Sequence, residues 1–251
     1  MKLTDNTIFI TGGGSGIGRG LAEALHKLGN KVIISGRRAG HLQAVVDANP
    51  GMESVELDVS SHADIERVAA KLIADYPTLN VLINNAGIML LDNVAAAHDE
   101  SVLLSQMETN LFGPVRLTSA LIEHLKKQPR STVIYNTSTL AYTPLAMFAA
   151  YSATKAALHS YVMSQRFMLK GTSVTVQEIA PPWVATGLVG ASDDPRAMPL
   201  DKFVAETMAA LATDAEEVLV DLARPNRNNP GPNEHAFVTE LNTYLSNELA
   251  G

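Results

Sequence analysis

The feature that most constrains the fold is a glycine-rich turn close to the N-terminus. Residues 11–18 read TGGGSGIG, after a strand candidate at 7–11 and before a helix candidate at 17–28. Glycines let a backbone turn tightly and approach a pyrophosphate, and a helix N-terminus presents free N–H groups to it. At the first strand–helix turn we therefore expect dinucleotide binding by Gly12, Ser15, Gly16, Ile17 and Gly18. A glycine-rich turn without a ligand is the alternative interpretation.

Short β-rich runs alternate with helical stretches along the rest of the chain. Further strands are expected at 31–35, 52–59, 79–84, 132–137 and 174–179, and further helices at 63–75, 95–127, 151–169, 200–212 and 234–247. Apolar strands separated by helices predict a parallel sheet covered on both faces, the doubly wound α/β architecture. We expect one domain over 1–251, with 187–224 as a small substrate-binding lid, and a kink or break of the long helix at Pro114.

Charge and cysteine content exclude several kinds of protein. The 251 residues include 19 Lys and Arg against 26 Asp and Glu, a net charge of −7, which argues against nucleic-acid binding. The absence of Cys excludes thiol nucleophiles, disulfides and cysteine-based zinc sites, and it fits a reducing cytoplasm. The seven His residues show no metal-ligand spacing, so no metal is expected. No apolar run reaches the roughly 18 residues of a membrane span, and we expect a soluble, cytoplasmic protein.

The end of the second expected strand bears on the choice of cofactor. An NAD-binding chain usually places a carboxylate there, on the ribose hydroxyls. Here the strand is followed by Arg37 and Arg38, whose guanidinium groups suit a 2′-phosphate. We expect NADP(H) rather than NAD(H), with a solvated arginine pair as the alternative.

Two further strand ends are expected to line the cofactor. Asp58 and Val59 close the third strand and could hold the adenine, although Asp58 is equally typical of a helix cap or turn. Asn85, Ala86 and Gly87 follow the fourth strand, where small residues let the backbone pass close to the ribose.

The strongest chemical signal lies on the expected helix at 151–169. Tyr151 and Lys155 are four residues apart and so share one helix face. An ammonium close by would lower the pKa of the tyrosine and let it exchange a proton with a carbonyl or an alcohol. Ser138, just past the fifth strand, could hydrogen-bond the substrate oxygen, and Asn110 could hold a relay water. Each residue alone has an ordinary structural explanation, but all lie where open α/β sheets bind ligands.

Together these motifs resemble the short-chain dehydrogenase/reductase family over nearly the whole chain. The family's Thr-Gly-x-x-x-Gly-x-Gly pattern, its Asn-Asn-Ala-Gly run and its catalytic tetrad are all present; the tetrad falls on Asn110, Ser138, Tyr151 and Lys155. The resemblance implies a Rossmann-like seven-stranded sheet, NAD(H) or NADP(H) binding, and a homodimer or homotetramer. It also implies that Lys155 binds the nicotinamide ribose.

One departure from the family pattern follows the sixth strand. The family usually has Pro-Gly there, whereas this chain has Pro181 and Pro182; Val184 and Thr186 are retained. The resemblance implies cofactor contacts at Pro181, Val184 and Thr186, in a loop that Pro182 should stiffen. The double proline is similar to the DltE-like branch of the family. The position of a seventh strand remains open, because 226–233 is rich in Pro and Asn.

We expect the substrate pocket near Leu140, Phe148, Trp183 and Leu188, beneath the lid at 187–224. These side chains are apolar, which favours an uncharged ketone or aldehyde, although some could be ordinary core residues. The sequence thus predicts an NADP(H)-dependent carbonyl reductase or alcohol dehydrogenase acting on a small molecule. The alternatives are an NAD(H)-dependent hydroxysteroid or polyol dehydrogenase, and a non-catalytic NADP(H)-sensing protein.

Overall fold

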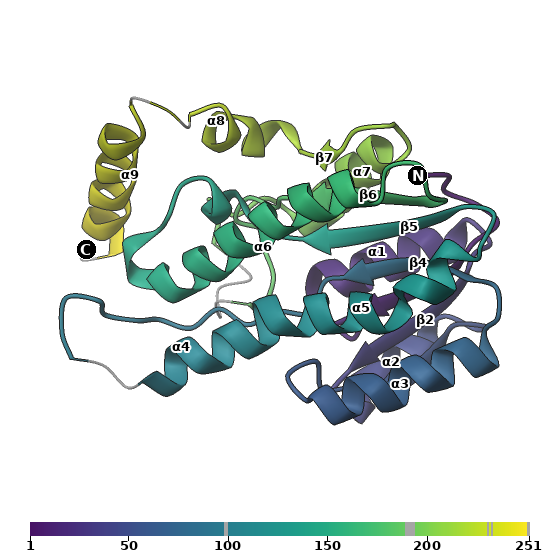
Figure 1. Ribbon diagram of the computed structural model, residues 1–251. Coiled ribbons are helices and arrows are strands. Elements are labelled where there is room, and N and C mark those ends of the chain that lie inside the picture. Colours follow the sequence, from purple (N-terminus) through teal and green to yellow (C-terminus); the bar gives the residue numbers. More distant parts are fainter. Residues whose placement is uncertain (98–99, 189–193, 230, 232, 250–251) are drawn as a thin grey trace.

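The computed structural model describes all residues except 98–99, 189–193, 230, 232 and 250–251, and contains a seven-stranded parallel sheet (Figure 1). The strand order is β3-β2-β1-β4-β5-β6-β7. The strands are β1 Thr7–Thr11, β2 Lys31–Gly36, β3 Glu53–Glu56, β4 Leu79–Asn84, β5 Ser131–Asn136, β6 Val174–Ile179 and β7 Glu217–Val218. This is the predicted Rossmann-like fold in a single domain.

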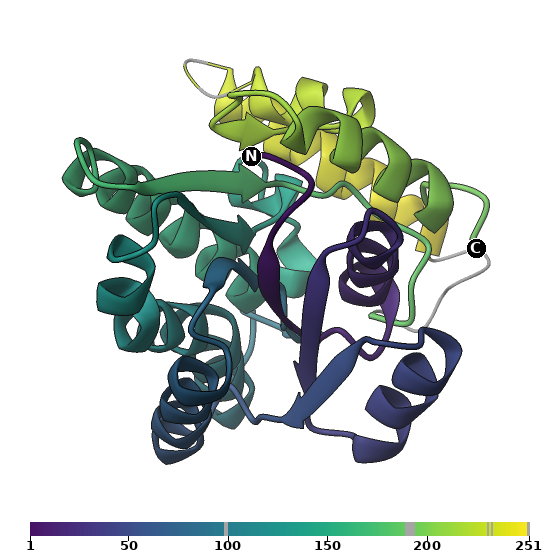
Figure 2. The same cartoon turned by 90° about the vertical axis from the view of Figure 1, so that its right-hand side faces the viewer.

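Helices cover both faces of the sheet (Figure 2). They are α1 Gly16–Lys27, α2 Ala39–Ala48, α3 His62–Asp75, α4 Glu100–Met107, α5 Gly113–Lys126, α6 Ala149–Met168, α7 Leu200–Leu211, α8 Arg224–Arg227 and α9 Glu234–Leu249. Short 3-10 turns lie at η2 Thr139–Ala141, η3 Ala146–Phe148 and η4 Asp221–Ala223. Among the described residues, no helix combines the length and the apolar character that a membrane crossing requires.

The central strand β1 shows why both faces must be covered. Successive side chains of a strand point to opposite faces, so Ile8 and Ile10 enter one core and Phe9 the other. All three are fully buried. The first core packs under α1, α2 and α7, and the second packs under α3, α5 and α6. A continuous apolar strand is therefore required here, as the sequence predicts.

Two expectations about the helical parts need correction. The chain does not break at Pro114, which lies in the first turn of α5, because Phe112 and Gly113 before it also have helical backbone. A π-helical segment, η1 Glu108–Phe112, joins α4 to α5 instead. The Pro and Asn content of 224–232 predicts a loop, but the stretch begins with the short helix α8, whose proline also lies in the first turn.

The seventh strand lies inside the segment that the sequence predicts to be only a lid. Strand β7 pairs in parallel with β6 through Glu178↔Glu217 and Ile179↔Val218. Two residues suffice for this edge strand, and such a short run carries no alternating pattern that sequence alone could reveal. Residues 189–193 of the expected lid lie outside the described residues.

The strand order places a topological switch between β1 and β4. From β1 the chain runs outward to β2 and β3, then returns to β4 on the other side of β1. In open α/β sheets, ligands bind in the crevice at the carboxyl ends of strands at such a point. The expected site residues follow these strand ends.

Candidate active site

The glycine-rich turn joins β1 to α1 at the switch point. Gly12 and Gly16 have φ values of +69° and +54°, a region that L side chains rarely adopt. A Cβ on Gly18 would clash with the carbonyl oxygen of Gly12 and with Asn85 Nδ2. Ser15 is the N-cap of α1, and its side chain lines an open depression beside the turn instead of capping the helix. The turn is thus a backbone cradle at a helix N-terminus, which suits a phosphate.

The end of β4 is fastened to this cradle. Thr11 Oγ1 accepts hydrogen bonds from the backbone N–H groups of Asn85 and Ala86 at 2.9 and 3.0 Å. Asn85 Nδ2 donates to the carbonyl of Thr11 at 2.8 Å. A Cβ on Gly87 would lie 3.3 Å from Asn110 Oδ1 and 3.7 Å from Lys155 Nζ. A side chain at position 87 would therefore crowd Asn110, so a small residue fits where this segment passes it.

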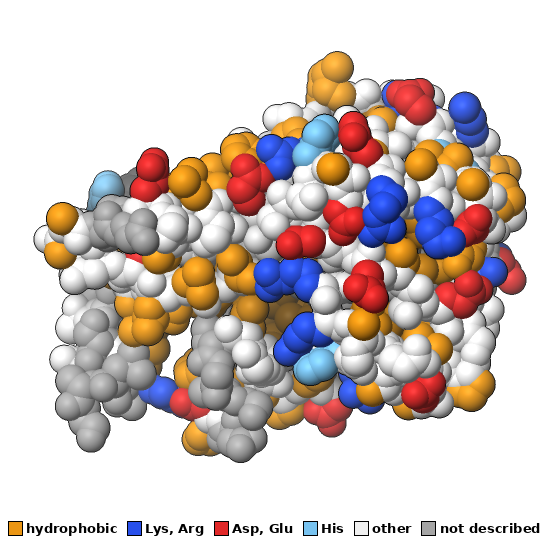
Figure 3. All heavy atoms as spheres, turned by 90° about the horizontal axis from the view of Figure 1, so that it is seen from below, with side chains coloured by type: hydrophobic (Ala, Val, Ile, Leu, Met, Phe, Trp, Pro, Cys, Tyr) orange, Lys and Arg blue, Asp and Glu red, His pale blue; other side chains and the backbone are white. Residues whose placement is uncertain are grey.

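The residues expected around the adenosine half lie at the ends of β2 and β3. Arg37 and Arg38 follow β2 with exposed side chains. Asp58 Oδ1 accepts hydrogen bonds from the backbone N–H and the hydroxyl of Ser60, at 3.0 and 2.7 Å. Asp58 therefore stabilises a turn in this structure, which is the alternative to adenine binding that the sequence indicated. Val59 is buried beside it. The face of the molecule drawn in Figure 3 has a hollow partly rimmed by Lys, Arg and His side chains.

Helix α6 brings Tyr151 and Lys155 beside the end of β5. Lys155 Nζ lies 5.5 Å from the centroid of the Tyr151 ring and donates a hydrogen bond of 2.8 Å to the backbone carbonyl of Asn136. Ser138, two residues further on, accepts a hydrogen bond from the N–H of Leu140 at 3.1 Å. Ser138, Tyr151 and Lys155 are all buried. The three side chains expected to do the chemistry therefore lie together.

Burial controls the charge of this group. It raises the pKa of Tyr151 to about 12, and hydrogen bonding with Ser138 partly opposes the rise. The lowered tyrosine pKa that the Tyr151–Lys155 spacing predicts is therefore not found, because the loss of water around the buried phenol outweighs the effect of the neighbouring ammonium. Burial lowers the pKa of Lys155 to about 8, and the negative charge of Glu178 partly opposes that fall. Tyr151 is thus protonated at neutral pH, which is the state that can donate a proton.

Asn110 lies in the π-helical segment and is held from both ends of its amide. Its Oδ1 accepts from the N–H of Ile88 at 2.9 Å, and its Nδ2 donates to the carbonyl of Ile88 at 2.8 Å and to Thr154 Oγ1 at 3.3 Å. The side chain fastens the segment after β4 to α6, the helix that carries Tyr151. Single π turns of this kind are frequent at functional sites.

Backbone contacts hold the loop after β6 against other segments of the chain. Pro181 accepts a hydrogen bond of 2.9 Å from Thr139 N–H, and Val184 forms a parallel bridge with Met198. Thr186 lies close to the glycine turn, since a Cβ on Gly16 would be 3.5 Å from its Cβ. The segment expected to contact the nicotinamide therefore borders the phosphate cradle.

The four expected substrate contacts differ in exposure. Leu140, Phe148 and Trp183 are half-buried, whereas Leu188 is 46% exposed. Trp183 Nε1 is buried and has no hydrogen-bond partner among the described residues. The Arg196 guanidinium lies 5.2 Å from the Trp183 ring centroid.

Sequence reasoning missed Asp92, which caps α6 from a distant loop. Its two carboxylate oxygens accept hydrogen bonds from the N–H groups of Ala149 and Ala150, at 3.0 and 2.6 Å. It thereby orients the first turn of α6, where Tyr151 lies. Asp92 is 57 residues before Ala149, and no local signal points to this contact.

Comparisons with known proteins agree on the family. Residues 6–197 match the family model described as short chain dehydrogenase. The chain is 43% identical over 195 residues to the uncharacterized oxidoreductase DltE of Bacillus subtilis (strain 168), covering 77% of each. It is 34% identical over 189 residues to the NADP-dependent 3-hydroxy acid dehydrogenase YdfG of Salmonella typhi, covering 74% of this chain and 73% of that one.

A solved structure shows the same fold. The short chain dehydrogenase from Burkholderia cenocepacia J2315, in complex with NADP, has a TM-score of 0.85 and 28% identity. The alignment covers 96% of this chain and 99% of that one. The protein is therefore an oxidoreductase of the short-chain dehydrogenase/reductase family, and within that family it belongs to the DltE-like branch.

Proposed function

We propose that the protein is an NADP(H)-dependent carbonyl reductase or alcohol dehydrogenase for a small, mostly apolar ketone, aldehyde or secondary alcohol. The observation that carries the proposal is the meeting of Ser138, Tyr151 and Lys155 in one buried cluster beside the end of β5. A proton donor, a neighbouring hydroxyl and a cation are the groups that carbonyl reduction requires of a protein.

The residues at the switch point fit a dinucleotide. NADP(H), when bound, supplies the hydride. Gly12 and Gly16 have φ values that L side chains rarely adopt, and Gly18 has no room for a Cβ, so the glycines allow the tight turn that presents the N-terminus of α1 to a diphosphate. Arg37 and Arg38 would bind the 2′-phosphate, and the names of YdfG and of the NADP-bound structure support that preference. The other proposed cofactor contacts are Ser15, Ile17, Asp58, Val59, Asn85, Ala86, Gly87, Tyr151, Lys155, Pro181, Val184 and Thr186.

The catalytic residues have separate tasks in this proposal. Tyr151, protonated at neutral pH, donates its phenolic proton to the carbonyl oxygen, and Ser138 orients that oxygen by a hydrogen bond. The Lys155 ammonium stabilises the phenolate that remains. Asn110 supports the proton relay through its place between the β4 end and α6.

The substrate would lie against Leu140, Phe148, Trp183 and Leu188, with part of 187–224 as a lid. Because three of these side chains are half-buried and apolar, an uncharged carbonyl compound is the expected substrate. The test panel must nevertheless include 3-oxo acids, since relatives at 34% identity are named as 3-hydroxy acid dehydrogenases. We also propose that the protein works in the cytoplasm, as a homodimer or homotetramer; light scattering after gel filtration measures the assembly.

The deciding experiment follows NADPH oxidation at 340 nm against aldehydes, ketones, diketones and 3-oxo acids, with Tyr151→Phe as the control. Turnover that disappears in this variant supports the proposal, and turnover that persists contradicts it. Equal use of NADH would favour the NAD(H)-linked dehydrogenase. Tight NADPH binding without any turnover would favour a cofactor-sensing protein.

A further inference from the structure

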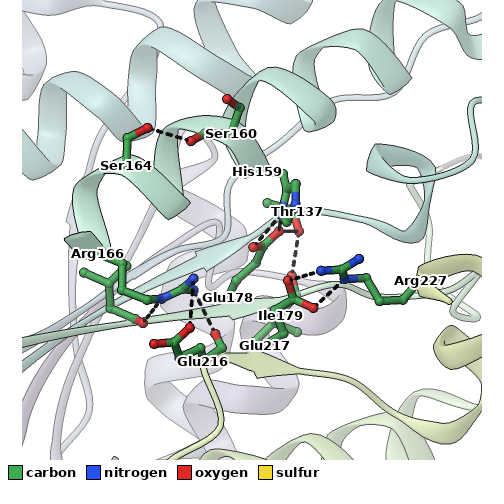
Figure 4. Close-up of polar contacts among 11 residues, drawn as sticks. Thr137, His159, Ser160, Ser164, Arg166, Glu178, Ile179, Glu216, Glu217 and Arg227 are labelled. Atoms are coloured by element: carbon green, nitrogen blue, oxygen red, sulfur yellow. Dashed lines mark hydrogen bonds and ion pairs between the residues drawn. The ribbon is translucent and has the colours of Figure 1, made fainter. Parts of the chain in front are cut away.

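A buried carboxylate, Glu178, lies between Thr137 and His159 (Figure 4). Glu178, on β6, is fully buried. Its Oε1 accepts a hydrogen bond of 2.6 Å from the Thr137 hydroxyl, and its two oxygens lie 2.9 and 2.8 Å from His159 Nδ1. His159 is on α6, one turn beyond Lys155. A fully buried carboxylate is costly unless it is paired, so this arrangement calls for an explanation.

Thr137 lies between Asn136 and Ser138, which contact Lys155 and Tyr151, respectively. The carbonyl of Asn136 accepts the hydrogen bond from Lys155 at 2.8 Å, and Ser138 hydrogen-bonds with Tyr151. Glu178 thus holds the middle of a three-residue segment whose two ends contact Lys155 and Tyr151. Through His159 it also holds α6, which carries both of them.

We propose that Glu178, which hydrogen-bonds with His159, is a positioning residue for the reaction. It fixes residues 136–138 against α6, and its negative charge stabilises the Lys155 ammonium. This inference rests on the proposed function, because it concerns the same lysine. In this proposal Glu178 acts through its hydrogen bond with Thr137 and through its electric field.

The charges around Glu178 favour this role. Burial lowers the pKa of Lys155, and Glu178 is the group whose charge raises it again. From β7, the Glu217 carboxylate is paired with Arg227 of α8 at 2.6 and 3.0 Å. Directly after η2, the Tyr142 ring meets the His159 ring edge-on, with centroids 5.0 Å apart.

The same cluster could be interpreted as a metal site. Ligand atoms of His159, Glu178 and Glu217 lie within 4.8 Å of one another. A metal would have to displace Arg227 from Glu217, however, and the two carboxylates already have partners, His159 for Glu178 and Arg227 for Glu217. The protein contacts alone therefore account for the cluster.

The first test compares Glu178→Gln with Glu217→Gln. Both changes remove one carboxylate from the cluster, but of the two only residue 178 contacts Thr137. We expect Glu178→Gln to lower kcat about tenfold at pH 7 with little change in the KM for NADPH, and Glu217→Gln to leave kcat within about twofold.

The alkaline limb of the kcat profile, where Lys155 loses its proton, should move about one pH unit lower in Glu178→Gln. An unchanged kcat and pH profile in folded Glu178→Gln would overturn the proposal.

A second measurement does not depend on turnover. In protein labelled with 13C at lysine ε-carbons, the Lys155 resonance, assigned with Lys155→Arg, is titrated in each variant. We expect its midpoint to fall by about one pH unit in Glu178→Gln and to stay unchanged in Glu217→Gln. An unchanged midpoint in Glu178→Gln contradicts the inference, even if no carbonyl substrate is found and the proposed function fails.

The hydrogen bond to Thr137 is tested separately, and this pair also serves if Glu178→Gln does not fold. Thr137→Val keeps the side-chain shape and removes the hydroxyl, whereas Thr137→Ser retains it. We expect kcat to fall severalfold in the valine variant and to be restored in the serine variant, with similar circular dichroism for both. Equal kcat in the two variants would show that the bond does not position the segment.

Discussion

The ammonium of Lys155 donates a hydrogen bond of 2.8 Å to the backbone carbonyl of Asn136 and is almost fully buried. A single carbonyl cannot replace the water that a charged amine loses on burial. The folded protein therefore holds this cation at a cost in stability.

The first prediction is that Lys155→Met stabilises the protein at neutral pH. The pKa of Lys155 is about 8 in the folded chain, against 10.5 for a lysine side chain in water. Between pH 8 and pH 10.5 the unfolded state therefore binds one proton more than the folded state. The destabilisation caused by burying the charged Lys155 is greatest below pH 8 and declines as the pH rises toward 10.5. We expect Lys155→Met to raise the free energy of unfolding by about 1–3 kcal/mol at pH 7 and by less at pH 10. Urea titrations of both proteins at each pH measure this difference. A less stable methionine variant at pH 7 would show that the ammonium stabilises the fold.

The second prediction concerns the cap on α6. Asp92→Ala removes the acceptor for the N–H groups of Ala149 and Ala150. We expect a loss of about 1–2 kcal/mol of stability, with Asp92→Asn losing less because one acceptor oxygen remains. Since Tyr151 lies in the same first turn, kcat should fall in the same order. Thermal unfolding and NADPH oxidation rates check both effects; full kcat in Asp92→Ala would show that the cap does not orient Tyr151.

The third prediction concerns the glycine turn. Gly18→Ala places a Cβ against the carbonyl oxygen of Gly12, a clash that the backbone must move to relieve. We expect a loss of about 1–3 kcal/mol of stability and a large loss of NADPH affinity, because the cradle is displaced. Gly40→Ala, in α2, is the matched control, since apart from its chain neighbours and the local helix backbone no described atom lies within 4 Å of its new Cβ. This control should be neutral or slightly stabilising. Cofactor fluorescence titrations compare the two, and equal NADPH affinity would contradict the assignment of the cradle.

The fourth prediction concerns cofactor preference. Arg37 follows β2 with an exposed side chain, and a charge-assisted bond to a 2′-phosphate contributes about 1.5–3 kcal/mol. We expect Arg37→Ala to weaken NADPH binding about tenfold or more and to leave NADH binding within about twofold. Arg224→Ala, an exposed arginine at the start of α8, serves as the control. Calorimetry with both cofactors distinguishes the cases, and an equal loss for NADPH and NADH would mean that Arg37 does not bind the 2′-phosphate.

The sequence alone was enough to predict the fold and to predict at which strand ends and helices the expected site residues lie. Strands such as β1 are apolar on both faces, and the glycine turn follows the first of them, so parallel pairing and the switch point follow from local patterns. Residues such as Ser138 and Asn85 lie at strand ends, and parallel strands bring their carboxyl ends to one edge. Weak local signals left the two-residue strand β7 undecided, and the proline rule wrongly allowed a break at Pro114.

Contacts between remote segments were decided only by the tertiary structure. Asp92 reaches Ala149 across 57 residues, and Thr137 reaches Glu178 across 41. Whether Glu178 faces Thr137 and His159 depends on the register of β5 against β6 and on the rotation of α6 over them. A change of one residue in register would turn each side chain to the opposite face of the sheet. Local sequence patterns determine which segments become strands and helices, whereas packing between those segments determines which polar side chains meet.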